Sequence, residues 1–258
     1  MSFLRTTWAI LTIRYLRELY RQPLVIFLTL LQPVIWLLLF GALFKRVAEL
    51  PGFGGGSYLT YLTPGVVIMT AMFSASWTGM SYIEDMTTGV LDRFLTAPVS
   101  RGALTTAMLG YQAVTTIVQS VIVLLLGWAI GAAYPGGPGG AAALTGVAVL
   151  LALAMAGLSD AFALLARQRE AVIGVSSILV LPLTFLSGAF LPLALVPHWI
   201  ADVARYNPVS WAASAGRAAV AARVPWGTVG SYAGFLALAI AVTAALATVS
   251  FRAYLQAS

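Results

Sequence analysis

Long uncharged stretches alternate along the chain with short polar ones, and each uncharged stretch is about as long as a membrane-crossing helix. A helix needs about 20 apolar residues to cross the hydrocarbon core of a bilayer. The pattern predicts six spans, at residues 24–44, 58–83, 103–133, 141–166, 171–191 and 231–251. We therefore expect an all-α integral membrane protein in which residues 1–258 form a single transmembrane domain.

Glycine and proline mark the expected breaks between these spans. Residues 45–57 are rich in glycine and predict a loop. The chain from Gly102 to Ser159 carries no charge and is too long for one crossing, so we expect a break at 134–140, YPGGPGG. Pro33 is expected to bend the first span, because its ring removes one backbone hydrogen bond.

Residues 1–22 have a different pattern, in which apolar and basic positions occupy opposite sides of a helix. Trp8, Leu11, Tyr15 and Leu19 recur three or four residues apart, and arginines lie between them. This stripe is typical of an amphipathic helix in the membrane interface, so we expect an elbow helix before the first span. A fraying basic tail is the alternative.

Composition supports the membrane class and limits the chemistry. The chain is 60% hydrophobic and 9% charged, whereas a soluble domain carries about 25% charged residues. It has no cysteine, one histidine (His198) and one lysine (Lys45), and it contains no phosphate-binding GxxxxGK[ST] loop. We therefore expect no bound metal or other cofactor and no ATPase site on this chain.

Basic residues predict the orientation, because they favour the cytoplasmic side of a membrane. With both termini in the cytoplasm, nine arginines lie inside: Arg5, Arg14, Arg17, Arg21, Arg93, Arg101, Arg167, Arg169 and Arg252. Five cations lie outside: Lys45, Arg46, Arg205, Arg217 and Arg223. These cations are scattered and form no dense patch, so we expect no nucleic-acid partner.

Residues 81–105, between the second and third spans, form a polar island of acidic and basic side chains among apolar ones at helical spacing. We expect a short amphipathic helix on one membrane face, suited to holding a soluble partner. A solvated connecting loop is the alternative.

Asp160 lies inside the fourth span, where a carboxylate is costly unless it is paired or hydrated. It is a candidate for the translocation path or a subunit contact, with pairing to Arg167 as the alternative.

From residue 192 to 224, charges punctuate short apolar pieces that contain several tryptophan and tyrosine residues. We expect short helices that dip part way into the membrane, because tryptophan and tyrosine favour the interface. Asn207 and Pro208 predict a turn between them.

Two stretches of this sequence resemble one known family, the permease subunits of type 2 ABC exporters, which include daunorubicin-resistance and nodulation-factor permeases. The first stretch contains Glu84, Asp85, Gly89, Leu91, Arg93, Phe94, Leu95, Pro98, Val99, Ser100 and Arg101. The second contains Leu186, Ser187, Gly188, Pro192, Pro197, Trp199, Asn207 and Pro208. Residues 85–88 depart from the family pattern, in which more charged residues are usual.

The resemblance implies a role for each stretch. It implies that Glu84, Asp85, Gly89, Leu91, Arg93, Phe94, Leu95, Pro98 and Arg101 form a coupling helix that docks on a separate ATP-binding subunit. It implies that Gly188, Pro192, Pro197, Trp199, Asn207 and Pro208 belong to outer re-entrant helices that gate the exit. It also implies two ATP-binding subunits carrying ATP and Mg, a second permease copy that is identical or paralogous, and a bacterial cell membrane.

We therefore expect an ATP-driven exporter of an amphiphilic drug, secondary metabolite or lipid. Export of lipid-linked polysaccharide or lipo-oligosaccharide is the alternative within the family. An ion-coupled secondary transporter is a further alternative, although such proteins usually carry several intramembrane charges and inverted repeats. A serine hydrolase using Ser74, Ser76 or Ser187 with His198 lacks the spacing that this chemistry needs.

Overall fold

The computed structural model describes residues 23–49, 57–88 and 101–256, and within these residues it contains helices and no strand. The helices are α2 (Pro23–Leu43), η1 (Lys45–Glu49), α3 (Tyr58–Ser76), α4 (Gly79–Thr87), α6 (Arg101–Ala129), α7 (Gly137–Ala166), α8 (Arg169–Phe185), η2 (Leu193–Leu195), α9 (His198–Ala204), α10 (Pro208–Val220) and α11 (Trp226–Gln256). The expectation of an all-α protein is confirmed for this part of the chain. The predicted elbow helix at 1–22 lies outside the described residues.

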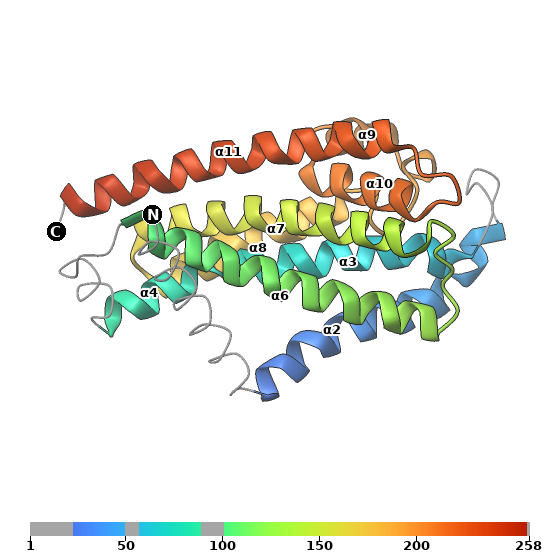
Figure 1. The fold of residues 1–258 in the computed structure, drawn as a ribbon, viewed down its shortest axis with the longest axis horizontal. Coiled ribbons are helices and arrows are strands. Elements are labelled where there is room, and N and C mark those ends of the chain that lie inside the picture. Colours follow the sequence, from blue (N-terminus) through green and yellow to red (C-terminus); the bar gives the residue numbers. More distant parts are fainter. Residues whose placement is uncertain (1–22, 50–56, 89–100, 257–258) are drawn as a thin grey trace.

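The long helices run side by side, and the short ones gather at the two ends of the bundle (Figure 1). α7 lies in the middle and packs against α3, α6, α10 and α11. α9, α10 and the α6–α7 turn lie at one end, whereas α4 and the C-terminal end of α11 lie at the other. Helix α4, which contains the beginning of the polar island, and residues 192–224 are therefore at opposite ends of the bundle.

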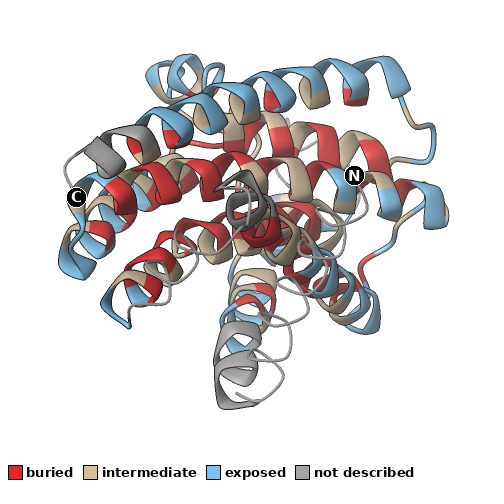
Figure 2. Ribbon diagram, turned by 60° about the vertical axis from the view of Figure 1, so that its left-hand side comes forward, coloured by how far each residue is buried: buried red, intermediate tan, exposed pale blue. Residues whose placement is uncertain are grey.

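The core lies where α3 and α7 meet their neighbours, and apolar side chains also cover the outside. Leu62 and Ile68 of α3 and Leu144 and Leu151 of α7 are fully buried, and buried residues line the inward faces of the helices (Figure 2). Large apolar side chains are exposed on several helices: Leu38, Leu125, Ile178, Leu238 and Val249. An apolar outer surface is unfavourable in water and suits contact with lipid.

Four helical stretches among the described residues are long and apolar enough to cross a membrane: Tyr58–Thr87, Ala107–Ala129, Gly137–Ala166 and Trp226–Phe251. In α2 the side chains are described only from Leu31 to Leu43, which is a shorter apolar stretch. These helices support a multi-pass membrane protein.

Several predicted boundaries are wrong, and the backbone explains why. α6 ends at Ala129 rather than 133. Gly131 adopts a positive φ of 104°, and the Ala132 N–H donates to the Gly127 carbonyl. This arrangement is a Schellman motif, which ends the helix. α7 begins at Gly137 rather than 141, because Pro138 lies in the first turn, where proline is tolerated. Only the beginning of YPGGPGG is therefore non-helical.

The predicted span 58–83 consists of two helices, α3 and α4, which are separated at Trp77 and Thr78. α7 approaches closely here, since a Cβ placed on Gly79 would lie 2.5 Å from the Ser159 carbonyl oxygen. The predicted span 171–191 is also too long, because α8 ends at Phe185.

Gly140 provides a test of the contact between α7 and α10. A Cβ placed on Gly140 would lie 2.2 Å from the Ala219 carbonyl oxygen, whereas one placed on Gly139 meets nothing within 4 Å. We expect Gly140→Ala to lower the free energy of unfolding by about 1–3 kcal/mol, as overpacking does. The control Gly139→Ala should raise it slightly, because alanine favours a helix by up to about 1 kcal/mol. Thermal unfolding in detergent measures both, and equal midpoints would contradict this packing.

Candidate functional site

The chain between α8 and η2, residues 186–192, is not helical and is buried in its middle part, and we call it the broken segment. Ser187, Gly188, Ala189 and Phe190 are all buried. Buried peptide groups without partners are costly, and irregular backbone at membrane depth is found only within protein or beside a wet cavity. Whether the broken segment is stable therefore depends on the hydrogen-bond partners of its buried peptide groups.

Asn207 connects the end of α8 to the beginning of α10 through three hydrogen bonds. Its amide nitrogen donates to the carbonyls of Leu183, at 2.7 Å, and Leu186, at 3.0 Å. Its amide oxygen accepts from the Val209 N–H at 2.9 Å, which makes Asn207 the N-cap of α10. Pro208 follows at the first helical position, where its missing N–H costs nothing. The predicted turn at Asn207 and Pro208 is confirmed as a helix start.

Two tyrosines of α3 satisfy further carbonyls of the broken segment. The Tyr61 hydroxyl donates to the Gly188 carbonyl at 2.9 Å, and the Tyr58 hydroxyl donates to the Phe190 carbonyl at 3.1 Å. The Gly188 N–H in turn donates to Ser210 Oγ of α10 at 3.3 Å. The segment is therefore held from two sides, by α3 and by α10.

Arg217 of α10 links α10 to both α3 and the broken segment. Its Nη2 donates to the Ala189 carbonyl at 2.7 Å, and its Nε donates to the Tyr61 carbonyl at 3.2 Å. Its guanidinium lies 3.7 Å from the centre of the Tyr61 ring, a cation–π distance. In the sequence, Arg217 serves only as a topology signal, and this role was not predicted. The signal in the sequence was a single cation within the Ala- and Gly-rich helix α10, because a cation among apolar residues is expected to be hydrogen-bonded within the protein.

The close approach in this region occurs at Gly65 rather than at Gly188. A Cβ placed on Gly65 of α3 would lie 2.2 Å from the Ala189 carbonyl oxygen. One placed on Gly188 would meet nothing closer than the Leu193 side chain at 3.4 Å. Gly188 also lacks the left-handed backbone that favours glycine. Its glycine is therefore not what permits the break.

The remaining predicted gate residues lie near the network without joining it. Pro192 precedes η2, and Pro197 precedes α9 as its N-cap. Trp199 of α9 is 60% exposed, and so is Trp226 at the start of α11. Exposed tryptophans at one end of an apolar bundle are typical of a membrane interface.

The structure places the two ends of the polar island, residues 81–88 and 101–105. Glu84 is exposed and Asp85 is buried, both in α4, and Arg101 is the first residue of α6. The other predicted coupling residues lie outside the described residues: Gly89, Leu91, Arg93, Phe94, Leu95 and Pro98.

The break between α3 and α4 is joined to α7 and α8 by serine hydroxyls, and we call this contact the α3–α4 joint. Ser159 Oγ donates to the Ser76 carbonyl at 2.7 Å and accepts from the Gly79 N–H at 3.1 Å. Ser176 Oγ of α8 also donates to the Ser76 carbonyl, at 2.8 Å. These bonds replace helical ones that the break removes, and they tie α4 to the middle of the bundle.

Asp160, next to Ser159 in α7, is 1% exposed. Neither of its carboxylate oxygens has a hydrogen-bond partner among the described residues. The structure therefore does not show the hydrogen-bonded pair with Arg167, and it leaves an uncompensated acid in a candidate membrane span. Within the described part of the chain, no group of three or more His, Cys, Asp or Glu side chains is placed to hold a metal ion.

Comparison with known proteins relates most of the chain to one family. The family model described as ABC-2 type transporter matches residues 6–221. A daunorubicin resistance ABC transporter permease, DrrB1 of Streptomyces coeruleorubidus, is 30% identical over 191 residues, which cover 72% of this chain and 65% of that protein. A putative transport permease, ycf38 of Cyanophora paradoxa, is 29% identical and covers 78% and 70%. A probable doxorubicin resistance permease, DrrC of Mycobacterium tuberculosis, is 23% identical and covers 80% and 74%.

Asn207 allows a test of the bonds that hold the broken segment. We expect Asn207→Ala to lower the free energy of unfolding by about 1 kcal/mol for the lost cap and a further 1–3 kcal/mol for the unpaired carbonyls. Asn207→Ser should lie between this variant and the wild type, because a serine keeps the cap and loses the two amide donors. Thermal unfolding in detergent measures the differences.

The neighbouring Tyr206 is 83% exposed and provides the control, since Tyr206→Ala should stay within about 0.5 kcal/mol of the wild type. The same thermal midpoint for Asn207→Ala and Tyr206→Ala would show that the broken segment does not depend on Asn207.

Proposed function

Since this chain belongs to the ABC-2 type transporter family and is a permease of an ABC exporter, we propose that it forms the membrane half of an ATP-driven machine that moves an amphiphilic drug or secondary metabolite out of the cytoplasm. The observation that carries this proposal is the family match across residues 6–221, which includes both the α3–α4 joint and the broken segment. The names of the two resistance permeases support this substrate class.

The proposed topology is one transmembrane domain with six spans in a bacterial cell membrane and both termini in the cytoplasm. Charge supports it, because nine arginines would lie inside and five cations outside. α4 and the C-terminal end of α11 would then face the cytoplasm, and α9 and α10 would face outward.

The polar island would act as the coupling helix that docks on a separate ATP-binding subunit. Two copies of that subunit would bind ATP and Mg, and a second permease copy would complete the path. The contacts at the α3–α4 joint support this role, because a force on α4 would reach α3, α7 and α8 through Ser76, Ser159 and Ser176. Closely packed elements transmit such displacements between discrete states.

The broken segment and the helices after it would form the outer gate. The hydrogen bonds of Tyr58, Tyr61 and Arg217 join α3 to the broken segment and α10. A movement of α3 relative to α8 and α10 would have to exchange these bonds. The gate would therefore have two discrete arrangements, held shut or open by alternative hydrogen bonds.

Reconstitution with a candidate ATP-binding subunit from the same organism tests the proposal. We expect the two proteins to co-purify and to accumulate daunorubicin in proteoliposomes when ATP is present. Arg93→Glu combined with Phe94→Ala should abolish both properties by removing the docking surface. Arg223→Glu is the matched control, because Arg223 is exposed beyond α10, and it should preserve both. Failure of the wild-type proteins to co-purify, or uptake driven by an ion gradient without ATP, would overturn the proposal.

Asp160 would belong to the translocation path or to a subunit contact, since an intramembrane acid without a partner is costly to keep. We expect Asp160→Asn to reduce ATP-driven daunorubicin transport several-fold with assembly unchanged, because an amide cannot release a proton as a carboxyl group can. Asp202→Asn, at a position exposed in α9, is the control and should transport like the wild type. Wild-type transport by Asp160→Asn would remove Asp160 from the path.

A further inference from the structure

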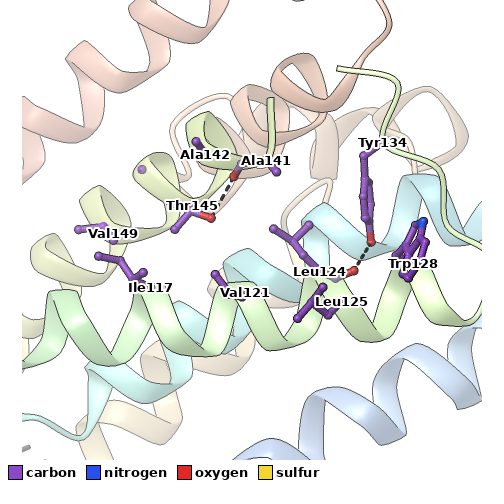
Figure 3. A pocket seen from close by; sticks show the side chains of 11 residues that line it. Ile117, Val121, Leu124, Leu125, Trp128, Tyr134, Ala141, Ala142, Thr145 and Val149 are labelled. Carbon is purple, nitrogen blue, oxygen red and sulfur yellow. Dashed lines mark hydrogen bonds between the residues drawn. The ribbon is translucent and has the colours of Figure 1, made fainter. Parts of the chain in front are cut away.

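A pocket of about 710 Å³ lies between α6 and α7 near the α6–α7 turn (Figure 3). It exists because long side chains of α6 face small ones of α7. A Cβ placed on Gly146 would meet no atom within 4 Å. The lining includes Ile117, Val121, Leu125 and Trp128 of α6 and Thr145 and Gly146 of α7.

The chemistry of this lining selects an uncharged hydrocarbon. None of the described lining residues is charged. The two hydroxyl groups already donate to backbone carbonyls, Tyr134 to Leu124 at 3.0 Å and Thr145 to Ala141 at 2.9 Å, as Figure 3 shows. A polar occupant would lose its hydrogen bonds to water and find few partners here beyond the Trp128 indole N–H and the lone pairs of the two hydroxyls, whereas a hydrocarbon would lose nothing.

The position of the pocket matches one leaflet of a bilayer. Trp128 follows Ile117 by three helical turns, so the pocket extends roughly 16 Å along α6, about half of a 30 Å hydrocarbon core. Trp128 is 69% exposed near the end of α6, and Tyr134 lies in the turn beyond it. Tryptophan and tyrosine favour the level of the headgroups. The pocket therefore reaches from the interface to the middle of the membrane.

An apolar pocket of about 710 Å³ that extends roughly 16 Å from the interface into the hydrocarbon core suits one flexible hydrocarbon chain.

We propose that the pocket binds one acyl chain of a membrane phospholipid from the leaflet that borders the α6–α7 turn. The headgroup lies at the level of Trp128 and Tyr134, and the chain fills the gap between α6 and α7. The site is independent of the ATP-binding subunit, because its lining comes from α6, α7 and the turn between them alone.

Photolabelling in proteoliposomes tests this site. The probe is phosphatidylcholine with a diazirine on one acyl chain, and peptide mass spectrometry locates the adducts. We expect adducts to concentrate within residues 117–149 and to fall there several-fold in Gly146→Leu, which fills the pocket. Gly234→Leu in α11 is the matched control, because a Cβ there also meets no atom within 4 Å, and it should label like the wild type.

Ala142→Leu fills the same pocket from the next turn and provides a second variant if Gly146→Leu does not fold. Undiminished labelling in a folded pocket-filling variant would overturn the proposal. So would adducts spread evenly over the exposed faces of α6, α8 and α11, which would indicate bulk lipid only. The chain has no cysteine, so Val121→Cys also allows a direct check, and a disulfide between two copies at this position would assign the pocket to a protein interface.

Discussion

The structure depends on one constraint, that buried peptide groups must be hydrogen-bonded even where the helix stops. α8 ends at Phe185 inside a cluster of apolar helices, and the chain then runs as irregular backbone through buried positions. Side chains from α3 and from the region of α10 supply the missing donors: Asn207, Tyr58, Tyr61 and Arg217. Without these side chains, the broken segment would bury carbonyl groups that have no hydrogen-bond partner, which is costly.

α3 takes part in both irregular regions and connects the two ends of the bundle. Near its beginning, Tyr58, Tyr61 and Gly65 meet the broken segment. Near its end, the Ser76 carbonyl accepts the hydroxyls of Ser159 and Ser176 at the α3–α4 joint. A helix is stiff along its axis, so a displacement at one end of α3 is felt at the other. This arrangement is the physical basis on which the proposed coupling rests.

Hydrophobic length and glycine or proline content predicted much of the helical framework, because both signals are local. The ends of α6, α7 and α8 were less predictable, since they depend on a Schellman cap at Gly131, on Pro138 in a first helical turn and on tertiary partners for the broken segment. The residues of the site were also hard to predict where their roles depend on tertiary partners. Asn207 followed by proline is a local signal, whereas the roles of Arg217, Gly65 and Tyr61 arise from residues far apart in the sequence. Resemblance to a family pointed to Gly188, but the close backbone contact is between Gly65 of α3 and Ala189 of the broken segment.

The three bonds of Asn207 also limit how this protein can vary over evolutionary time. The position needs two N–H donors and one acceptor on a short side chain, directed at Leu183, Leu186 and Val209. Glutamine has the same groups on a longer stem, whereas aspartate, serine and threonine lack the two amide donors. A lineage that replaces this asparagine therefore has to rebuild the end of α8 or the start of α10 at the same time, and drift at this position is expected to be slow.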